Sequence, residues 1–185
     1  MKALRVVLAI VVTVFVSVPV LGSGEHTDRL QATLIGYQEV PSVSSPATGE
    51  FHATIAADQL SIDYEETFSG LIGTVQQSHI HFGQRGVSGS VVVWLCQTTT
   101  TPAPAAVAGI TPFCPQSGKV SGTITAANVI TASTASQQIV AGELAEVIAA
   151  IRAGFAYANV HSTPLNPAGE IRGQIRVLEQ GDKDR

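Results

Sequence analysis

Two histidines one residue apart, His79 and His81, stand in a stretch whose residues suit a β-strand. Side chains two residues apart on a strand project from the same face, about 6.5 Å apart along the backbone, so two imidazoles can converge on one ion. A third histidine, His161, ends another strand-like run, residues 155–161. Three imidazoles without a thiolate suit copper or zinc and leave a coordination position open. If the two strands are neighbours, the sequence predicts a copper or zinc site; otherwise the histidines form only the polar face of a strand.

A second group of polar residues, Asn159, Glu170 and Arg172, lies near the histidine that ends the later run. Glu170 and Arg172 follow an Asn-Pro-Ala-Gly turn and alternate with apolar residues, which is typical of a strand with one polar face. One interpretation makes Arg172 an anion anchor beside the histidines. The others make the group a solvated strand face or a buried hydrogen-bond network.

Two cysteines, Cys96 and Cys114, are the only ones in the chain. An even number of cysteines in an exported protein favours a disulfide, which here would close the loop 97–113. A thiolate metal site is disfavoured because no Cys-x-x-Cys spacing is present. Closing a loop of this length stabilises a fold by about 3 kcal/mol in the chain-entropy model.

The first 24 residues have the pattern of a secretory signal peptide. Lys2 and Arg5 precede an apolar stretch, residues 6–18, and small residues follow where cleavage would occur. The apolar stretch is shorter than the roughly 20 residues of a spanning helix, so an uncleaved N-terminal anchor is the less favoured alternative. We therefore expect a secreted or otherwise extracytoplasmic protein with one domain, residues 25–180, and a polar tail, residues 181–185.

The rest of the chain reads as short strands separated by turns. Segment 142–152 differs, because its apolar residues recur at helical spacing and Gly154 suits a helix stop. The run 91–95 is apolar on both faces, which is typical of a central strand. These features predict an all-β fold, a Greek-key β-sandwich with one short helix. The expected strands are 30–35, 49–57, 59–68, 91–95, 119–125 and 170–178.

Charge and motifs exclude several function classes. The net charge is −4, from 10 Lys and Arg against 14 Asp and Glu, and no basic run argues for a nucleic-acid partner. The chain has no His-Glu-x-x-His, Gly-x-Ser-x-Gly, phosphate-binding glycine loop or dinucleotide fingerprint. No catalytic residue is assigned, and an enzymatic role is therefore disfavoured.

Four stretches carry a family pattern: Leu34 to Pro41, Ser78 to Gly83, Ala153 to Ser162 and Pro167 to Ile175. Taken together, they resemble the CHRD domain, a β-rich extracellular module found in chordin and singly in exported microbial proteins. The resemblance implies a fold more than an activity, and binding to another protein is the role of its best-known member.

A weaker likeness is to copper-zinc superoxide dismutases, which carry a His-x-His on one strand, a later histidine and an arginine that attracts the anion. His79, His81, His161 and Arg172 occur here in that order, but the zinc loop and a fourth copper ligand have no counterpart. Three functions follow as hypotheses. The favoured one is a non-enzymatic module that binds an extracellular protein, a surface polymer or a metal ion through its histidine-bearing face. The alternatives are a copper-dependent redox enzyme and a purely structural module.

Overall fold

The computed structural model describes residues 27–178, so the predicted signal peptide and the polar tail lie outside the described residues. The described chain forms one antiparallel sheet of nine strands. This confirms the predicted all-β class. The strands are β1 (Asp28–Ile35), β2 (Thr48–Ile55), β3 (Ile62–Ser69), β4 (Thr74–Phe82), β5 (Ser90–Cys96), β6 (Gly118–Ile124), β7 (Ala156–Thr163), β8 (Asn166–Gln174) and β9 (Arg176–Val177).

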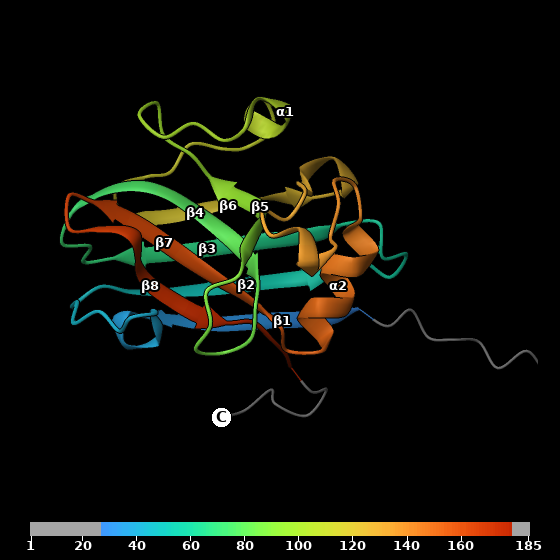
Figure 1. The fold of residues 1–185 in the computed structure, drawn as a ribbon, viewed down its shortest axis with the longest axis horizontal. Coiled ribbons are helices and arrows are strands. Elements are labelled where there is room, and N and C mark those ends of the chain that lie inside the picture. The colour runs from blue at the N-terminus through green and yellow to red at the C-terminus, as the bar shows by residue number, and fades with distance from the viewer. Residues whose placement is uncertain (1–26, 179–185) are drawn as a thin grey trace, which may run out of the picture.

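The sheet folds over on itself as a nearly closed sandwich. Its hydrogen-bonded order is β5-β4-β7-β8-β1-β2-β3-β6, with β9 paired to β1. Strands β4, β7 and β8 run diagonally across β1, β2 and β3 (Figure 1). Strand β6 contacts β5 at the other end of the path, and β7 returns to lie beside β4. Strand β7 follows β4, β5 and β6 in the chain and returns to pair with β4, which is the return of the predicted Greek-key connection.

Alternation along the strands directs one set of side chains into the sandwich. In β2, Phe51 and Ile55 are almost completely buried while His52 between them is exposed. In β3, Ile62 and Phe68 are likewise buried against them in the same core. Strand β7 differs, because its residues from Ala156 to Ser162 are all buried. The site described below is therefore built on the most enclosed strand of the sheet.

The position of β5 corrects one expectation. Its apolar residues predict a central strand, but β5 ends the hydrogen-bonded path of the sheet. The segment after β6 covers its outer edge: Val129 bridges Val93, and the backbone N–H of Ile130 donates to the carbonyl of Val92. A loop, rather than another full strand, thus protects this edge of the sheet.

The predicted helix is confirmed as α2 (Leu144–Arg152), whose four apolar residues Leu144, Val147, Ile148 and Ile151 are buried. It lies at one end of the sandwich (Figure 1). A second helix of a single turn, α1 (Ala105–Ala108), was not predicted. Three 3-10 turns complete the described chain: η1 (Gly36–Gln38), η2 (Ala126–Asn128) and η3 (Ala135–Gln137).

The predicted disulfide between Cys96 and Cys114 is present. It fixes the end of β5 to the loop that carries α1, and the backbone of Gln97 pairs with that loop beside it. Within residues 27–178, no helix is both long enough and apolar enough to cross a membrane.

Candidate metal centre

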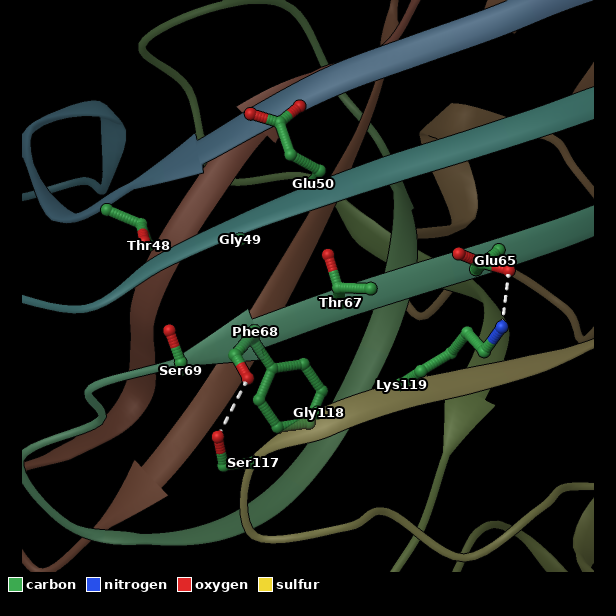
Figure 2. A pocket seen from close by; sticks show the side chains of 10 residues that line it. All are labelled: Thr48, Gly49, Glu50, Glu65, Thr67, Phe68, Ser69, Ser117, Gly118 and Lys119. Carbon is green, nitrogen blue, oxygen red and sulfur yellow. Dashed lines mark hydrogen bonds and ion pairs between the residues drawn. The ribbon is translucent and has the colours of Figure 1, made fainter.

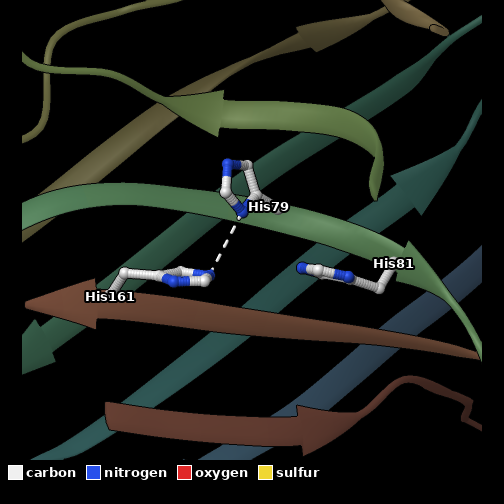
Figure 3. Close-up of side chains that lie close together, drawn as sticks. All are labelled: His79, His81 and His161. Atoms are coloured by element: carbon white, nitrogen blue, oxygen red, sulfur yellow. Dashed lines mark hydrogen bonds between the residues drawn. The ribbon is translucent and has the colours of Figure 1, made fainter. Parts of the chain in front are cut away.

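The three histidines meet because β4 and β7 are antiparallel neighbours. Their register places His79 opposite Asn159 and Gln77 opposite His161, which is the strand pairing that the sequence prediction required. Ring nitrogens from His79, His81 and His161 all lie within 4.8 Å of one another. Figure 3 shows the three rings turned toward a common space. All three side chains are buried, with exposed fractions of 2%, 8% and 6%.

Two backbone carbonyls determine the tautomers of His81 and His161. Nδ1 of His81 lies 2.9 Å from the carbonyl oxygen of Gly89. Nδ1 of His161 lies 3.0 Å from the carbonyl oxygen of Pro167. A carbonyl can only accept, so each neutral ring must carry its proton on Nδ1. The Nε2 lone pair of each ring is then free to bind a cation, the arrangement that orients histidines in metal sites.

His79 is held differently. Its Nδ1 lies 3.3 Å from Nε2 of His161, and its ring packs edge-on against Trp94 with the ring centres 4.3 Å apart. Nε2 of His79 is buried and has no hydrogen-bond partner, and the same is true of Nε2 of His81. Without an ion, Nδ1 of His79 donates to His161; a bound ion would instead take the nitrogen lone pairs that face the common space.

The electrostatics keep the rings neutral. Burial lowers the pKa of His79 well below its usual value, and the two neighbouring histidines lower it further. Burial also lowers the pKa of His81, to about 4, against the hydrogen bond to Gly89 that raises it. The pKa of His161 is lowered by burial in spite of its bond to Pro167. Neutral imidazole is the form that binds metal, so no proton has to leave at neutral pH.

Asn159 and Arg172 both lie beside the histidines. The Oδ1 atom of Asn159 is 3.1 Å from Nε2 of His161. The guanidinium carbon of Arg172 lies 3.6 Å from the ring centre of Tyr157, and His81 stacks on the same ring at 4.7 Å. Arg172 also donates to the carbonyls of Gln84 and Val87, which ties the loop after β4 to the sheet. The role of Arg172 as an anion anchor stays a prediction.

Glu170 belongs to a different cluster. Its carboxylate accepts hydrogen bonds from the hydroxyls of Ser45 and Ser162 and from the backbone N–H of Ile72. Burial raises its pKa, but these bonds outweigh burial and hold the pKa below its usual range. Glu170 therefore joins the loop before β2, the loop before β4 and strand β7. It is a buried carboxylate whose oxygens are paired with hydrogen-bond donors.

Sequence reasoning missed Glu39 as a site residue. It follows η1 in a loop, where no alternation or motif spacing marks a buried carboxyl. The side chain is only 7% exposed. Burial raises its pKa to about 7, although the charge of Arg172 and a hydrogen bond from Asn159 lower it. The sole sequence signal is its place in the stretch Leu34 to Pro41, which carries the family resemblance.

Two of the surface clefts in the described part of the chain bear on the position of the site. One of about 400 Å³ is lined by Glu39, Arg85 and Arg172, among others, and Arg172 links it to the histidine cluster through Tyr157, on which His81 also stacks. The other, of about 550 Å³, lies over β2, β3 and β6 and includes the ion pair between Lys119 and Glu65 (Figure 2). No histidine lines this second cleft, so it is separate from the candidate metal centre.

The Greek-key sandwich, its disulfide-closed loop and its enclosed histidine cluster define a small β domain of the extracellular type. Residues 30–175 match the sequence profile of the CHRD domain, and the chain belongs to this family. The match confirms the resemblance found in the sequence. No curated protein and no solved structure matches the chain. CHRD domains are typically extracellular, and the disulfide is compatible with that setting.

Proposed function

We propose that this CHRD domain is a non-enzymatic module that binds one copper or zinc ion through His79, His81 and His161. One observation carries the proposal. The carbonyls of Gly89 and Pro167 hold the Nδ1 protons of two histidines, so that both Nε2 lone pairs are presented inside the protein. Metal-binding histidines in proteins are oriented by this kind of backbone contact.

Burial favours a small ligand over a protein or polymer. The three histidines are at most 8% exposed, so a macromolecule could not contact them without opening the sheet. A single ion needs only the space between the rings. It would also satisfy Nε2 of His81, a buried nitrogen that has no hydrogen-bond partner. A buried polar atom without a partner costs about 1–3 kcal/mol, which a purely structural network would leave uncompensated.

The redox alternative has one observation in its favour. Arg172 and His81 contact the same ring, that of Tyr157, so a cationic group lies close to the proposed ion. Catalysis also needs an open coordination position that a substrate can reach. The burial of the three ligands supports binding rather than turnover. An assay for superoxide consumption by the copper-loaded protein separates the redox enzyme from the binding module. Non-enzymatic binding predicts no more turnover than the same amount of free copper gives.

Export is part of the same proposal. The signal-peptide pattern in residues 1–24 and the Cys96–Cys114 disulfide both suit an oxidising, extracytoplasmic compartment. Fractionation of cells that express the full chain tests this, and N-terminal sequencing of the exported form locates the cleavage. Retention of the chain in the cytoplasm with both thiols reduced would contradict it.

The test of binding is metal analysis of the purified protein, followed by calorimetric titration with Zn²⁺ and Cu²⁺. The wild-type protein is expected to take up one equivalent, and His81→Ala is expected to lose most of that affinity. His52→Ala is the matched control, because His52 lies exposed on β2, away from the cluster. Equal stoichiometry and affinity in His81→Ala and the wild type would overturn the proposal.

A further inference from the structure

Three histidines leave one position of a four-coordinate ion to another group. We propose that Asn159 supplies its Oδ1 atom as the fourth ligand and that Glu39 orients the Asn159 amide for this role. This inference rests on the proposed function and extends it, because it assigns a complete donor set of three nitrogens and one oxygen.

The sheet places Asn159 at the centre of the histidine cluster. It lies opposite His79 in the β4–β7 register and two residues before His161, so its side chain shares their face. Its Oδ1 atom is 3.1 Å from Nε2 of His161. The side chain is 2% exposed, so water does not compete freely for that oxygen.

The contact between Asn159 and His161 brings two acceptors together. His161 uses the single proton of its neutral ring on Nδ1, which faces the carbonyl of Pro167. Its Nε2 atom therefore presents a lone pair, and 3.1 Å away Oδ1 of Asn159 presents another. Two lone pairs at this distance repel, and the N–H of His79, whose Nδ1 lies 3.3 Å from Nε2 of His161, offsets this only at the nitrogen. A metal ion bound to both atoms supplies a positive charge to each.

Rotating the amide by 180° would place a donor against His161, but Glu39 opposes this. The amide of Asn159 lowers the pKa of the nearby Glu39 carboxyl, an effect that requires the NH₂ group on that side. With Glu39 ionised, the rotated amide would direct Oδ1 at the carboxylate oxygens, another pair of acceptors, and Oε1 of Glu39 has no hydrogen-bond partner. Glu39 thus acts as a positioning residue, and its own charge is balanced by nearby Arg172.

Gly169 keeps Glu39 in place. A Cβ atom at position 169 would lie 2.5 Å from Oε1 of Glu39, and the backbone φ of +133° there suits glycine alone. The Asn-Pro-Ala-Gly stretch, predicted as a turn, forms the start of β8, and the Glu39 carboxyl packs directly on its backbone. The same stretch contains Pro167, which orients His161. The start of β8 thus positions both the histidine and the carboxyl beside the fourth ligand.

The donor set bears on the identity of the ion. Amide oxygen is a harder ligand than imidazole nitrogen and contributes more to a divalent ion than to soft Cu⁺. Three imidazoles with one amide oxygen should therefore favour Zn²⁺ or Cu²⁺. Loss of the oxygen should weaken the binding of these ions and leave the affinity for Cu⁺ almost unchanged.

The experiment is competition for Zn²⁺ against a coloured chelator, with wild type, Asn159→Ala, Asn159→Asp and Asn159→Leu. The alanine and leucine variants are expected to bind Zn²⁺ about 10–100-fold more weakly, the range seen when groups around a metal are removed. The aspartate variant, which keeps an oxygen and adds a charge, should bind at least as tightly as wild type. A merely structural asparagine would make aspartate as harmful as alanine.

Two further variants test the role of Glu39. Glu39→Ala should weaken Zn²⁺ binding, whereas Glu39→Gln, which keeps an acceptor for the amide, should restore most of it. Asn128→Ala is the matched control, a buried asparagine that closes η2 and is not part of the histidine cluster. If the wild type binds Zn²⁺ and Asn159→Ala binds it equally tightly, this inference alone is overturned. No Zn²⁺ or Cu²⁺ binding by wild type would overturn the proposed function with it.

Discussion

Nδ1 of His161 lies 3.0 Å from the carbonyl oxygen of Pro167, six residues further along the chain. This contact fixes which nitrogen of His161 faces His79 and Asn159. The first residues of β8 therefore set the protonation pattern of the candidate metal centre. The first prediction follows from this arrangement.

Zn²⁺ should raise the thermal stability of the wild-type protein and leave that of His161→Ala unchanged. A ligand that binds only the folded state stabilises it by about 2.7 kcal/mol when present at 100 times its Kd. The measurement is Tm by calorimetry with and without Zn²⁺, with His52→Ala as the control that keeps the full shift. An equal Zn²⁺-dependent shift in His161→Ala would count against the centre.

Gly169→Ala should be more harmful than a comparable glycine substitution elsewhere. Gly118 is the comparison, since it also has a positive φ, +110°, but no atom within 4 Å of an added Cβ. Gly118→Ala should show only the backbone cost of about 1–3 kcal/mol. Gly169→Ala bears the same cost and must also displace the Glu39 carboxyl.

Urea unfolding and Zn²⁺ competition measure the two effects separately. Both alanine variants should lose stability, and only Gly169→Ala should also lose Zn²⁺ affinity. Equal Zn²⁺ affinity in the two variants would show that the position of Glu39 does not matter to the centre.

Glu66 predicts a pH dependence that is independent of the metal. It lies on β3 with no exposed surface, and neither carboxyl oxygen has a well-formed hydrogen bond. Burial raises its pKa to about 8, although the nearby Ser78 hydroxyl lowers it. The folded chain then keeps a proton that the unfolded chain loses above its ordinary pKa of about 4.5. Stability should therefore fall as pH rises from about 4.5 to about 8.

Glu66→Gln should remove this contribution, because glutamine does not titrate. Between pH 5 and pH 8.5, the free energy of unfolding of the variant relative to the wild type should rise by more than about 1 kcal/mol, since one pKa unit corresponds to about 1.4 kcal/mol. Urea unfolding at several pH values gives the free energy of unfolding against pH for both proteins. Glu39 is present in both, so its own titration contributes equally to the two curves. Parallel curves would show that Glu66 is not held protonated in the fold.

The disulfide should contribute about 3 kcal/mol to the free energy of unfolding, as expected for a closed loop of this size. Replacing Cys96 and Cys114 together by serine should lower stability by that amount. A reducing agent should destabilise the wild type and leave the double variant unaffected. Equal unfolding curves for wild type and the double variant would contradict a stabilising bond.

The sequence predicted the strands of β2 and β3 and the helix α2 well, because their apolar residues recur with a clear period. It placed β5 at the centre of the sheet, since burial on both faces looks the same whether a strand or a loop covers the edge. The histidines were visible as residues, but their meeting depended on the β4–β7 pairing, which arises from long-range contacts. Glu39 gave no periodic signal because it lies in a loop, and its carboxyl packs against Gly169, more than 100 residues away.

The most direct test of the central claim is a crystal structure of the protein grown with Zn²⁺, with anomalous data collected across the zinc edge. The account predicts one strong anomalous peak inside the sandwich, bonded to His79, His81 and His161 at about 2.0–2.1 Å. The same map shows whether Oδ1 of Asn159 occupies the fourth position. No peak at the three histidines in crystals saturated with Zn²⁺, or a peak only on surface side chains such as His52, would contradict the account.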